Sequence, residues 1–187
     1  MQFLTEKELL SLLKSAKARS SRDWAMMLLT YRHGLRASEV TGLKLADVDL
    51  KCKSVRVHRL KGSMESLQSL DTLAGQPLLD EPAALRAWLA DRQDDSDYLF
   101  TSQKGGRLTA NAFWRLFQVI ASDAGIEGRS AHALKHTRAS LMIQGGASLA
   151  DVRQQLGHKS LSSTLLYVHS TDKQAGLAAR KSEANIF

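Results

Sequence analysis

The sequence is poor in cysteine and has no long apolar run. Its 187 residues contain one cysteine, Cys52, so an internal disulfide and a cysteine-rich zinc site are both excluded. No apolar stretch approaches the length needed to cross a membrane, and residues 1–6 lack the basic-then-apolar pattern of a secretory signal. We therefore expect a cytoplasmic protein with no membrane partner.

Internal repeats, low-complexity tracts and internal linkers are also missing, which favours a single domain. A chain of 187 residues can bury a substantial core, and 43% hydrophobic with 24% charged residues is ordinary for a soluble globular protein. The net charge of +7 and the pI of about 9.7 suit a polyanionic partner such as DNA or RNA. Composition alone fits a merely basic protein equally well.

Apolar periodicity and capping residues predict that most of the chain is helical. Thr5 with Glu8, and Ser148 with Asp151, have the spacing of capping boxes at helix starts. Residues 18–22 are expected to form a polar connector. The expected helices cover 6–16, 24–31, a short segment from 38, 83–91, 110–125, 133–144, 148–156 and 161–168.

Only a short part of the sequence has the pattern typical of β-strands. Residues 54–58 alternate apolar and polar, a turn is expected at 61–63, and a return strand at 65–70. Residues 47–50 are expected to form a turn. The predicted fold class is therefore mainly α with a small antiparallel β-sheet (α+β).

Several residues suit the binding of a phosphate. Arg36 follows the most apolar predicted helix, and a guanidinium that is partly buried needs an anion, either a ligand or Glu39. His132 and Lys135 lie three residues apart, so on a helix they share a face and can hold an anion together. His158 and Tyr167 follow from later helices.

Each of these residues also has an ordinary structural interpretation. Tyr167 fits a half-buried tyrosine, Lys61 a solvated charge at a hairpin, and His158 a cap for the preceding helix. His132 and His136 have the i, i+4 spacing of a zinc pair. Because no glutamate stands beside the first histidine and no third ligand lies nearby, we expect no metal.

Taken together, the motifs resemble the catalytic domain of the tyrosine recombinase (phage integrase) family over nearly the whole chain. The resemblance is carried by Gly34-Leu35-Arg36-Ala37-Ser38-Glu39, by Lys61 on the hairpin, by the His132 to Lys135 helix start, by Leu156-Gly157-His158, and by Tyr167 nine residues later.

The resemblance implies a single tyrosine-recombinase-like catalytic domain that cuts and rejoins DNA. Tyr167 would attack the phosphate and form a 3′-phosphotyrosyl link, and Lys61 would protonate the leaving 5′ oxygen. Arg36 and Lys135 would be fixed donors on the phosphate, and His132 and His158 would hydrogen-bond the phosphate or help to take the tyrosine proton. No cofactor and no metal are implied. The outcome would be inversion, integration or excision at a specific DNA site.

Two departures from the family pattern leave alternatives open. Lys135 stands where the family has a second arginine, and lysine lacks the planar fork that holds two phosphate oxygens. No helical clamp domain precedes the motifs, as in the small invertases that switch fimbrial promoters. A catalytically weak or inactive DNA-binding regulator, and a type IB topoisomerase-like relaxing enzyme, are the alternatives.

The resemblance also implies the partners: double-stranded DNA, a homo-tetramer on that DNA, and accessory DNA-bending proteins at the bacterial nucleoid. Residues 1–171 would form the catalytic domain. Residues 172–187 would form a tail that is exchanged between protomers, with a frayed terminus as the alternative. Basic residues elsewhere are candidate phosphate contacts: Arg32, Lys44, Arg56, Arg59, Lys104, Arg107, Arg115, Arg129 and Lys159.

Overall fold

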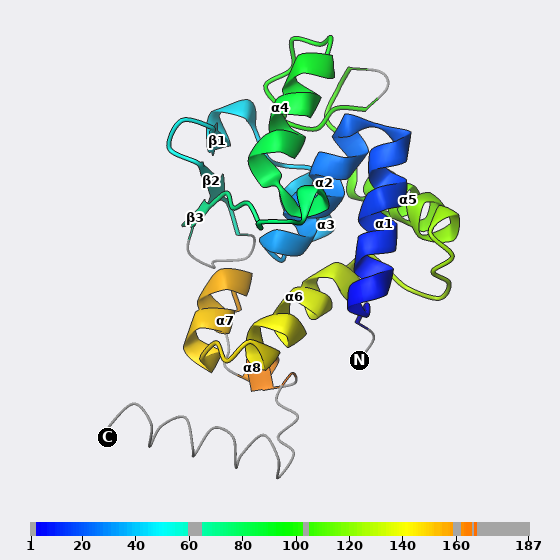
Figure 1. The fold of residues 1–187 in the computed structure, drawn as a ribbon. Coiled ribbons are helices and arrows are strands. Elements are labelled where there is room, and N and C mark those ends of the chain that lie inside the picture. Colours follow the sequence, from blue (N-terminus) through cyan, green and yellow to red (C-terminus); the bar gives the residue numbers. More distant parts are fainter. Residues whose placement is uncertain (1–2, 60–64, 103–104, 159–161, 166, 168–187) are drawn as a thin grey trace.

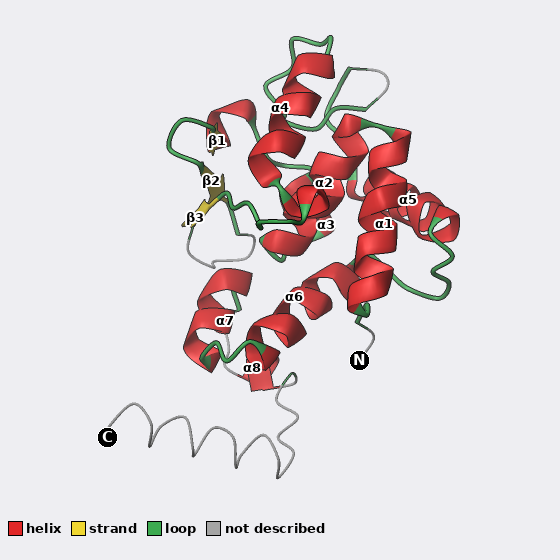
Figure 2. Cartoon of the chain, viewed as in Figure 1, coloured by secondary structure: helices red, strands yellow, loops and turns green. Residues whose placement is uncertain are grey.

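A computed structural model describes residues 3–59, 65–102, 105–158, 162–165 and 167 of the chain. Most of this part is helical, and a small sheet lies on the side of the molecule away from α1 and α5 (Figures 1 and 2). The predicted class, mainly α with a small antiparallel sheet, is confirmed. No helix in the described ranges is long and apolar enough to cross a membrane.

The first two helices share one capping residue. Thr5 and Glu8 form the predicted capping box of α1 (Glu6–Arg19), and Ser20 ends that helix in an extended conformation. The Ser20 hydroxyl then accepts from the Asp23 amide and starts α2 (Ser21–Arg32). The polar connector expected at 18–22 is wrong, because a single serine can serve as the C-cap of one helix and the N-cap of the next.

The helix α2 forms the centre of the core. Its residues from Asp23 to Tyr31 are all buried, and it packs against α1, α4 (Glu81–Asp91) and α6 (His132–Gln144). On the other side of α1 lies α5 (Ala110–Asp123), which buries Phe113 and Phe117 (Figure 1). Burying apolar side chains from these five helices gives this part of the fold most of its stabilisation.

The sheet has three antiparallel strands in the order β1-β2-β3. These are β1 (Val48–Asp49), β2 (Ser54–Val57) and β3 (Ser66–Ser69), with Val55 paired to Val48 and Gln68. The turn expected at 47–50 is wrong: 3-10 helix η1 (Leu45–Asp47) runs directly into β1. The turn expected at 61–63 lies outside the described residues.

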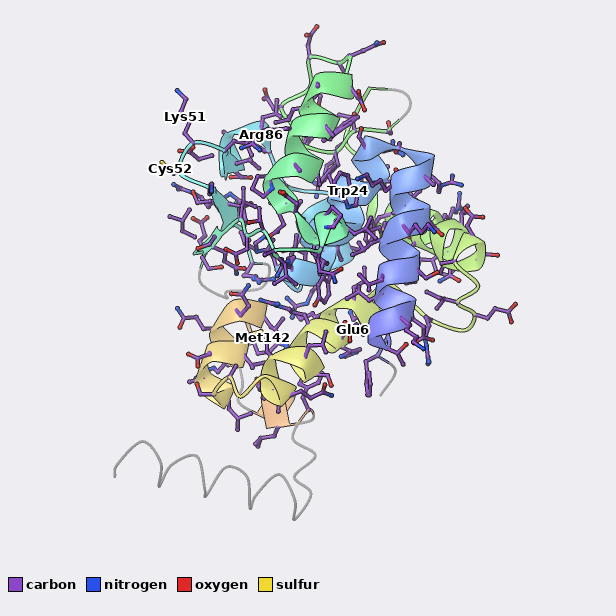
Figure 3. The ribbon with its side chains drawn as sticks, in the orientation of Figure 1. Glu6, Trp24, Lys51, Cys52, Arg86 and Met142 are labelled. Carbon is purple, nitrogen blue, oxygen red and sulfur yellow. The ribbon has the colours of Figure 1, made fainter. Side chains whose placement is uncertain are left out.

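The later helices form a smaller group below the sheet in Figure 1. They are α6, α7 (Leu149–Leu156) and α8 (Ser162–Leu165), the last falling within the expected 161–168. A separate apolar cluster joins α6 to α7 and to Tyr167, which follows α8. Met142, labelled in Figure 3, packs at the edge of this cluster, and Tyr167 is one of its buried members. Residues 172–187 lie outside the described part.

The remaining elements are short. The helix α3 (Ala37–Val40) follows the corner after α2, and 3-10 helix η2 (Pro77–Leu79) precedes α4. Cys52 is exposed beyond β1 (Figure 3).

Two sets of polar contacts position the site helices. The Leu4 amide donates to Thr137 Oγ1 at 2.8 Å, which fixes the start of the chain to α6. Gln68 on β3 and Gln155 on α7 exchange hydrogen bonds of 2.7 and 3.1 Å, and Gln68 Oε1 lies 2.8 Å from His33 Nδ1. The base of the hairpin is therefore fixed to α7 and to the end of α2.

Candidate active site

The corner between α2 and α3 brings the predicted Arg36 up to α7. Gly34 has φ of +56°, and a Cβ at this position would collide with Leu156 Cδ2 of α7. Only glycine combines this backbone conformation with such a close approach. The tight corner places Arg36 at the start of α3, where 38% of its side chain is exposed.

Glu39 joins two arginines beneath this corner. One carboxylate oxygen accepts from Arg36 Nη1 at 2.8 Å, and the other accepts from Arg59 Nη1 at 2.9 Å and the Arg36 amide at 2.8 Å. Burial opposes ionisation of Glu39, but these hydrogen bonds and the charge of Arg59 outweigh it and lower its pKa. Pairing of Arg36 with Glu39, one of the two interpretations of the sequence, is present.

Arg59 holds three segments of the fold together, a role that the sequence did not reveal. Its side chain is fully buried, so its predicted role as a DNA contact is wrong. Its guanidinium also donates to backbone oxygens of His33 at 2.8 Å and Gln155 at 2.6 Å. The bonds join the end of β2, the corner after α2 and the end of α7. No sequence signal separates Arg59 from the exposed Arg56 three residues before it, other than the alternation of burial in the strand.

Lys135 lies beside this pair of arginines and is 5% exposed. Its Nζ donates to the Leu156 carbonyl oxygen at 2.7 Å. Burial, followed by the charges of Arg59 and Arg36, lowers its pKa from 10.5 to about 7. The family arginine is thus replaced by a cation that is only partly protonated near neutral pH.

His158 and Tyr167 stack against each other next to these cations. Their ring centroids lie 6.2 Å apart with an interplanar angle of 9°. His158 Nδ1 lies 3.0 Å from Thr164 Oγ1 of α8. Burial, then the charges of Lys135 and Arg36, lowers the pKa of His158 to about 4, so this imidazole is neutral at pH 7.

His136 contacts the reacting group of the predicted nucleophile. Its Nδ1 lies 2.6 Å from the Tyr167 hydroxyl oxygen. Burial raises the pKa of Tyr167, and burial together with the charges of His132 and Lys135 lowers the pKa of His136. The sequence singled out His136 only for its zinc-like spacing from His132, so its contact with Tyr167 was missed.

The structure thus gathers Arg36, Lys135, His158 and Tyr167. His132, at the start of α6, is exposed, and its ring centroid lies 6.3 Å from that of His136. Lys61 lies outside the described residues. Within the described ranges, no three His, Cys, Asp or Glu side chains are grouped so that they could hold a metal ion.

The candidate DNA contacts other than the buried Arg59 fall into three groups. Lys44, Arg56 and Arg115 are exposed. Arg32, Arg107 and Arg129 are engaged within the protein: Arg32 donates to the Leu79 carbonyl oxygen, Arg107 donates to that of Thr41, and Arg129 lies 3.8 Å from Glu8. Lys104 and Lys159 lie outside the described residues.

Comparisons with known proteins place this arrangement among recombinases. The family model described as "Phage integrase family" matches residues 2–174. The type 1 fimbriae regulatory protein FimB of Escherichia coli K12 is 32% identical over 176 residues, covering 90% of this chain and 84% of FimB. The tyrosine recombinase XerC of Corynebacterium glutamicum is 35% identical over 156 residues, covering 82% of this chain but 48% of XerC.

Solved structures agree with the sequence comparisons. The crystal structure of XerA recombinase has a TM-score of 0.81 and 26% identity, covering 97% of this chain and 65% of XerA. The XerH site-specific recombinase bound to its difH substrate has a TM-score of 0.77 and 26% identity, covering 96% of this chain and 54% of XerH. The chain therefore spans between about half and two thirds of the length of these larger recombinases.

Proposed function

This chain belongs to the phage integrase family, and we propose that it is a site-specific DNA recombinase that breaks and rejoins DNA through Tyr167. The observation that carries the proposal is the position of the Tyr167 hydroxyl, 2.6 Å from one histidine ring and beside a second, next to the cations Arg36 and Lys135. A phenol, neutral imidazoles and fixed cations are the groups that transfer of a phosphodiester to a tyrosine requires.

The proposed reaction begins with the scissile phosphate at Arg36 and Lys135. Among the described contacts Arg36 uses Nη1 for Glu39, which leaves its other N–H groups for a phosphate oxygen. The approach of a phosphate favours the protonated form of Lys135, which then adds a second cation. These donors stabilise the charge that builds on the non-bridging oxygens.

The covalent step exchanges one phosphoester for another. Tyr167 gives its proton to a neighbouring histidine ring and its oxygen forms a bond to phosphorus; the bond from phosphorus to the 5′ oxygen breaks, and the 5′ oxygen leaves with a proton. By the family resemblance, Lys61 supplies that proton. The 3′-phosphotyrosyl link keeps the energy of the broken bond, so a 5′ hydroxyl can attack it and rejoin the strand.

The proposal is tested by trapping the covalent adduct. The substrates are nicked duplexes of randomised sequence. When cleavage occurs near the nick, the short fragment that carries the new 5′ hydroxyl diffuses away and cannot rejoin. The protein–DNA adduct therefore accumulates, and its ends can be sequenced. Wild-type protein is expected to yield adducts that share one sequence, while Tyr167→Phe binds the same DNA without forming them. Adduct formation by Tyr167→Phe would exclude Tyr167 as the nucleophile.

A regulator that binds DNA without cutting it is the second candidate function. It is favoured by Lys135 in the position of the family arginine, and the relative FimB is named as a regulatory protein. Sequence-selective binding by the wild-type protein with no adduct would support it. Relaxation of a supercoiled plasmid that lacks the selected sequence would instead favour the topoisomerase-like alternative.

The assembly and the location of the protein are part of the proposal. Solved relatives include recombinases bound to their DNA substrates, which supports double-stranded DNA as the partner. A tetramer on DNA, accessory bending proteins, a catalytic domain at 1–171, exchange of the tail at 172–187 and a cytoplasmic location stay predictions. Size-exclusion chromatography with light scattering on the selected DNA measures the number of protomers.

A further inference from the structure

His136 is a half-buried, titratable residue to which the family resemblance assigns no role. It lies on α6, one residue after Lys135 and one turn after His132. Among the described contacts, its polar partner is the hydroxyl of Tyr167, 31 residues further along the chain. A distance of 2.6 Å between Nδ1 and the hydroxyl oxygen is at the short end for this kind of hydrogen bond.

We propose that His136 is a catalytic residue that positions the Tyr167 hydroxyl and accepts its proton as the oxygen attacks phosphorus. This inference deepens the proposed recombinase function and rests on it. It assigns the removal of the tyrosine proton to one ring nitrogen, His136 Nδ1, and leaves His132 and His158 to the phosphate.

The direction of the hydrogen bond follows from the surroundings of the two groups. Burial favours the protonated phenol of Tyr167 and the uncharged imidazole of His136. The phenol therefore donates, and Nδ1 accepts with the ring hydrogen on Nε2. An acceptor aligned at this distance is in reach of the proton that has to leave.

The neighbouring charges fit the same assignment. The groups near His136 are His132 and Lys135 on α6, and Tyr167 with His158 stacked against it. The positive charges of His132 and Lys135 oppose a second proton on the resting ring. A phosphate bound at the cations would offset this repulsion, so His136 would gain a proton only with the substrate in place.

The proton is conserved through the proposed cycle. When Tyr167 attacks, its proton moves to His136 Nδ1 and the ring becomes imidazolium. When a 5′ hydroxyl later attacks the phosphotyrosyl link, the phenolate oxygen leaves and takes that proton back. No external acid or base is required at this atom.

The first arm of the test uses the protein without DNA. Nitrogen-15 spectra of the histidine rings are expected to show His136 as the Nε2–H tautomer, with an Nδ1 signal that shifts in Tyr167→Phe. A protonated Nδ1, or a signal indifferent to Tyr167→Phe, overturns the contact. This arm gives its answer whether or not the protein cuts DNA.

The second arm measures single-turnover adduct formation from pH 5 to 9 on the selected nicked duplex. In this substrate a sulfur atom replaces the bridging 5′ oxygen at the scissile phosphate. A thiolate leaves without a general acid, so the rate does not depend on protonation of the leaving group. The rate of His136→Ala is expected to fall roughly 100-fold. His136→Asn keeps a polar group near the hydroxyl and is expected to recover part of the lost rate. In the wild-type protein the rate should rise with pH over the acidic range in which His136 loses its proton. Neither variant should show this rise. Ser140→Ala, one turn further along α6, is the control and keeps the wild-type profile.

The two proposals fail in different ways. Wild-type adduct formation together with a His136→Ala rate within threefold of it overturns only the role of His136. A His136→Ala variant that cleaves faster than wild type also overturns it, since the contact would then hold the tyrosine back. No adduct from any variant overturns the recombinase function and the catalytic role together.

Discussion

Gly157 and Arg59 occupy adjoining space at the end of α7. A Cβ on Gly157 would lie 2.7 Å from both Cδ and Nε of the buried Arg59 side chain, closer than real Cβ contacts allow. Gly157 also has φ of +62°, where side chains are strained. The glycine of the Leu-Gly-His motif therefore leaves room for the arginine that joins α7 to β2 and to the corner after α2.

Replacing Gly157 is expected to displace Arg59. Gly157→Ala combines a backbone cost of roughly 1–2 kcal/mol with this steric clash. The free energy of unfolding, measured in urea, should therefore fall by more than the backbone cost alone. Gly125→Ala is the matched control, because Gly125 ends α5 with φ of +70° and has no neighbour within 4 Å. Equal losses in the two variants would contradict the steric role of Gly157.

Lys135 is expected to make the free energy of unfolding depend on pH in the neutral to alkaline range. Its folded pKa of about 7 lies below the ordinary 10.5, so between these values the unfolded chain binds a proton that the folded chain does not. Stability from this group therefore rises as pH increases from about 7 to 10.5. Lys135→Met removes the buried charge and should be more stable at pH 6, by roughly 1–4 kcal/mol. Urea titrations at pH 6, 8 and 9.5 should show the two proteins converging; parallel curves would refute the shift.

Restoring the family arginine is expected to accelerate cleavage. A guanidinium stays charged at all relevant pH values and offers a second hydrogen bond to the phosphate, worth roughly 1.5–3 kcal/mol. Lys135→Arg should therefore raise the rate of adduct formation about 10- to 100-fold. Lys14→Arg, at an exposed lysine that is not a candidate DNA contact, is the control. An unchanged or slower Lys135→Arg would mean that the pocket is fitted to lysine.

Glu39 is expected to be required for stability above acidic pH. Because its folded pKa is lowered, its stabilising contribution is present above pH 4.5 and is lost as the pH falls through the lowered value. Glu39→Gln leaves buried Arg59 without its carboxylate and should cost roughly 3–5 kcal/mol at pH 7. Thermal unfolding from pH 3 to 7 measures this, with Glu127→Gln, at an exposed glutamate, as the control. A loss no larger than that of Glu127→Gln would show that backbone oxygens alone can satisfy Arg59.

The features that sequence analysis predicted correctly depend on neighbours within one helical turn. The capping boxes at Thr5 and Ser148 are satisfied by side chains three residues away, so their spacing was enough to locate α1 and α7. Arg36, Lys135, His158 and Tyr167 are the exception: they lie together although they come from distant segments, and the order of the recombinase motifs identified them. Their catalytic roles remain predictions.

The features that it missed depend on contacts between distant segments. Arg59 and Arg56 are alike in sequence, and only the meeting of β2 with α7 buries one and exposes the other. His136 was compared with His132 because they share a helix, whereas its partner Tyr167 follows the last described helix. Ser20 ends one helix and caps the next. A pattern that looks for one helix at a time cannot distinguish such a shared capping residue from a linker.

The bond from the Leu4 amide to Thr137 Oγ1 has a practical consequence for every assay above. Thr137 follows His136 on α6, so a purification tag joined ahead of Phe3 would begin close to the part of α6 that contacts Tyr167. Adduct rates measured with such an extension would mix the proposed chemistry with steric obstruction by the extension, and cleaving it off beforehand keeps the two apart.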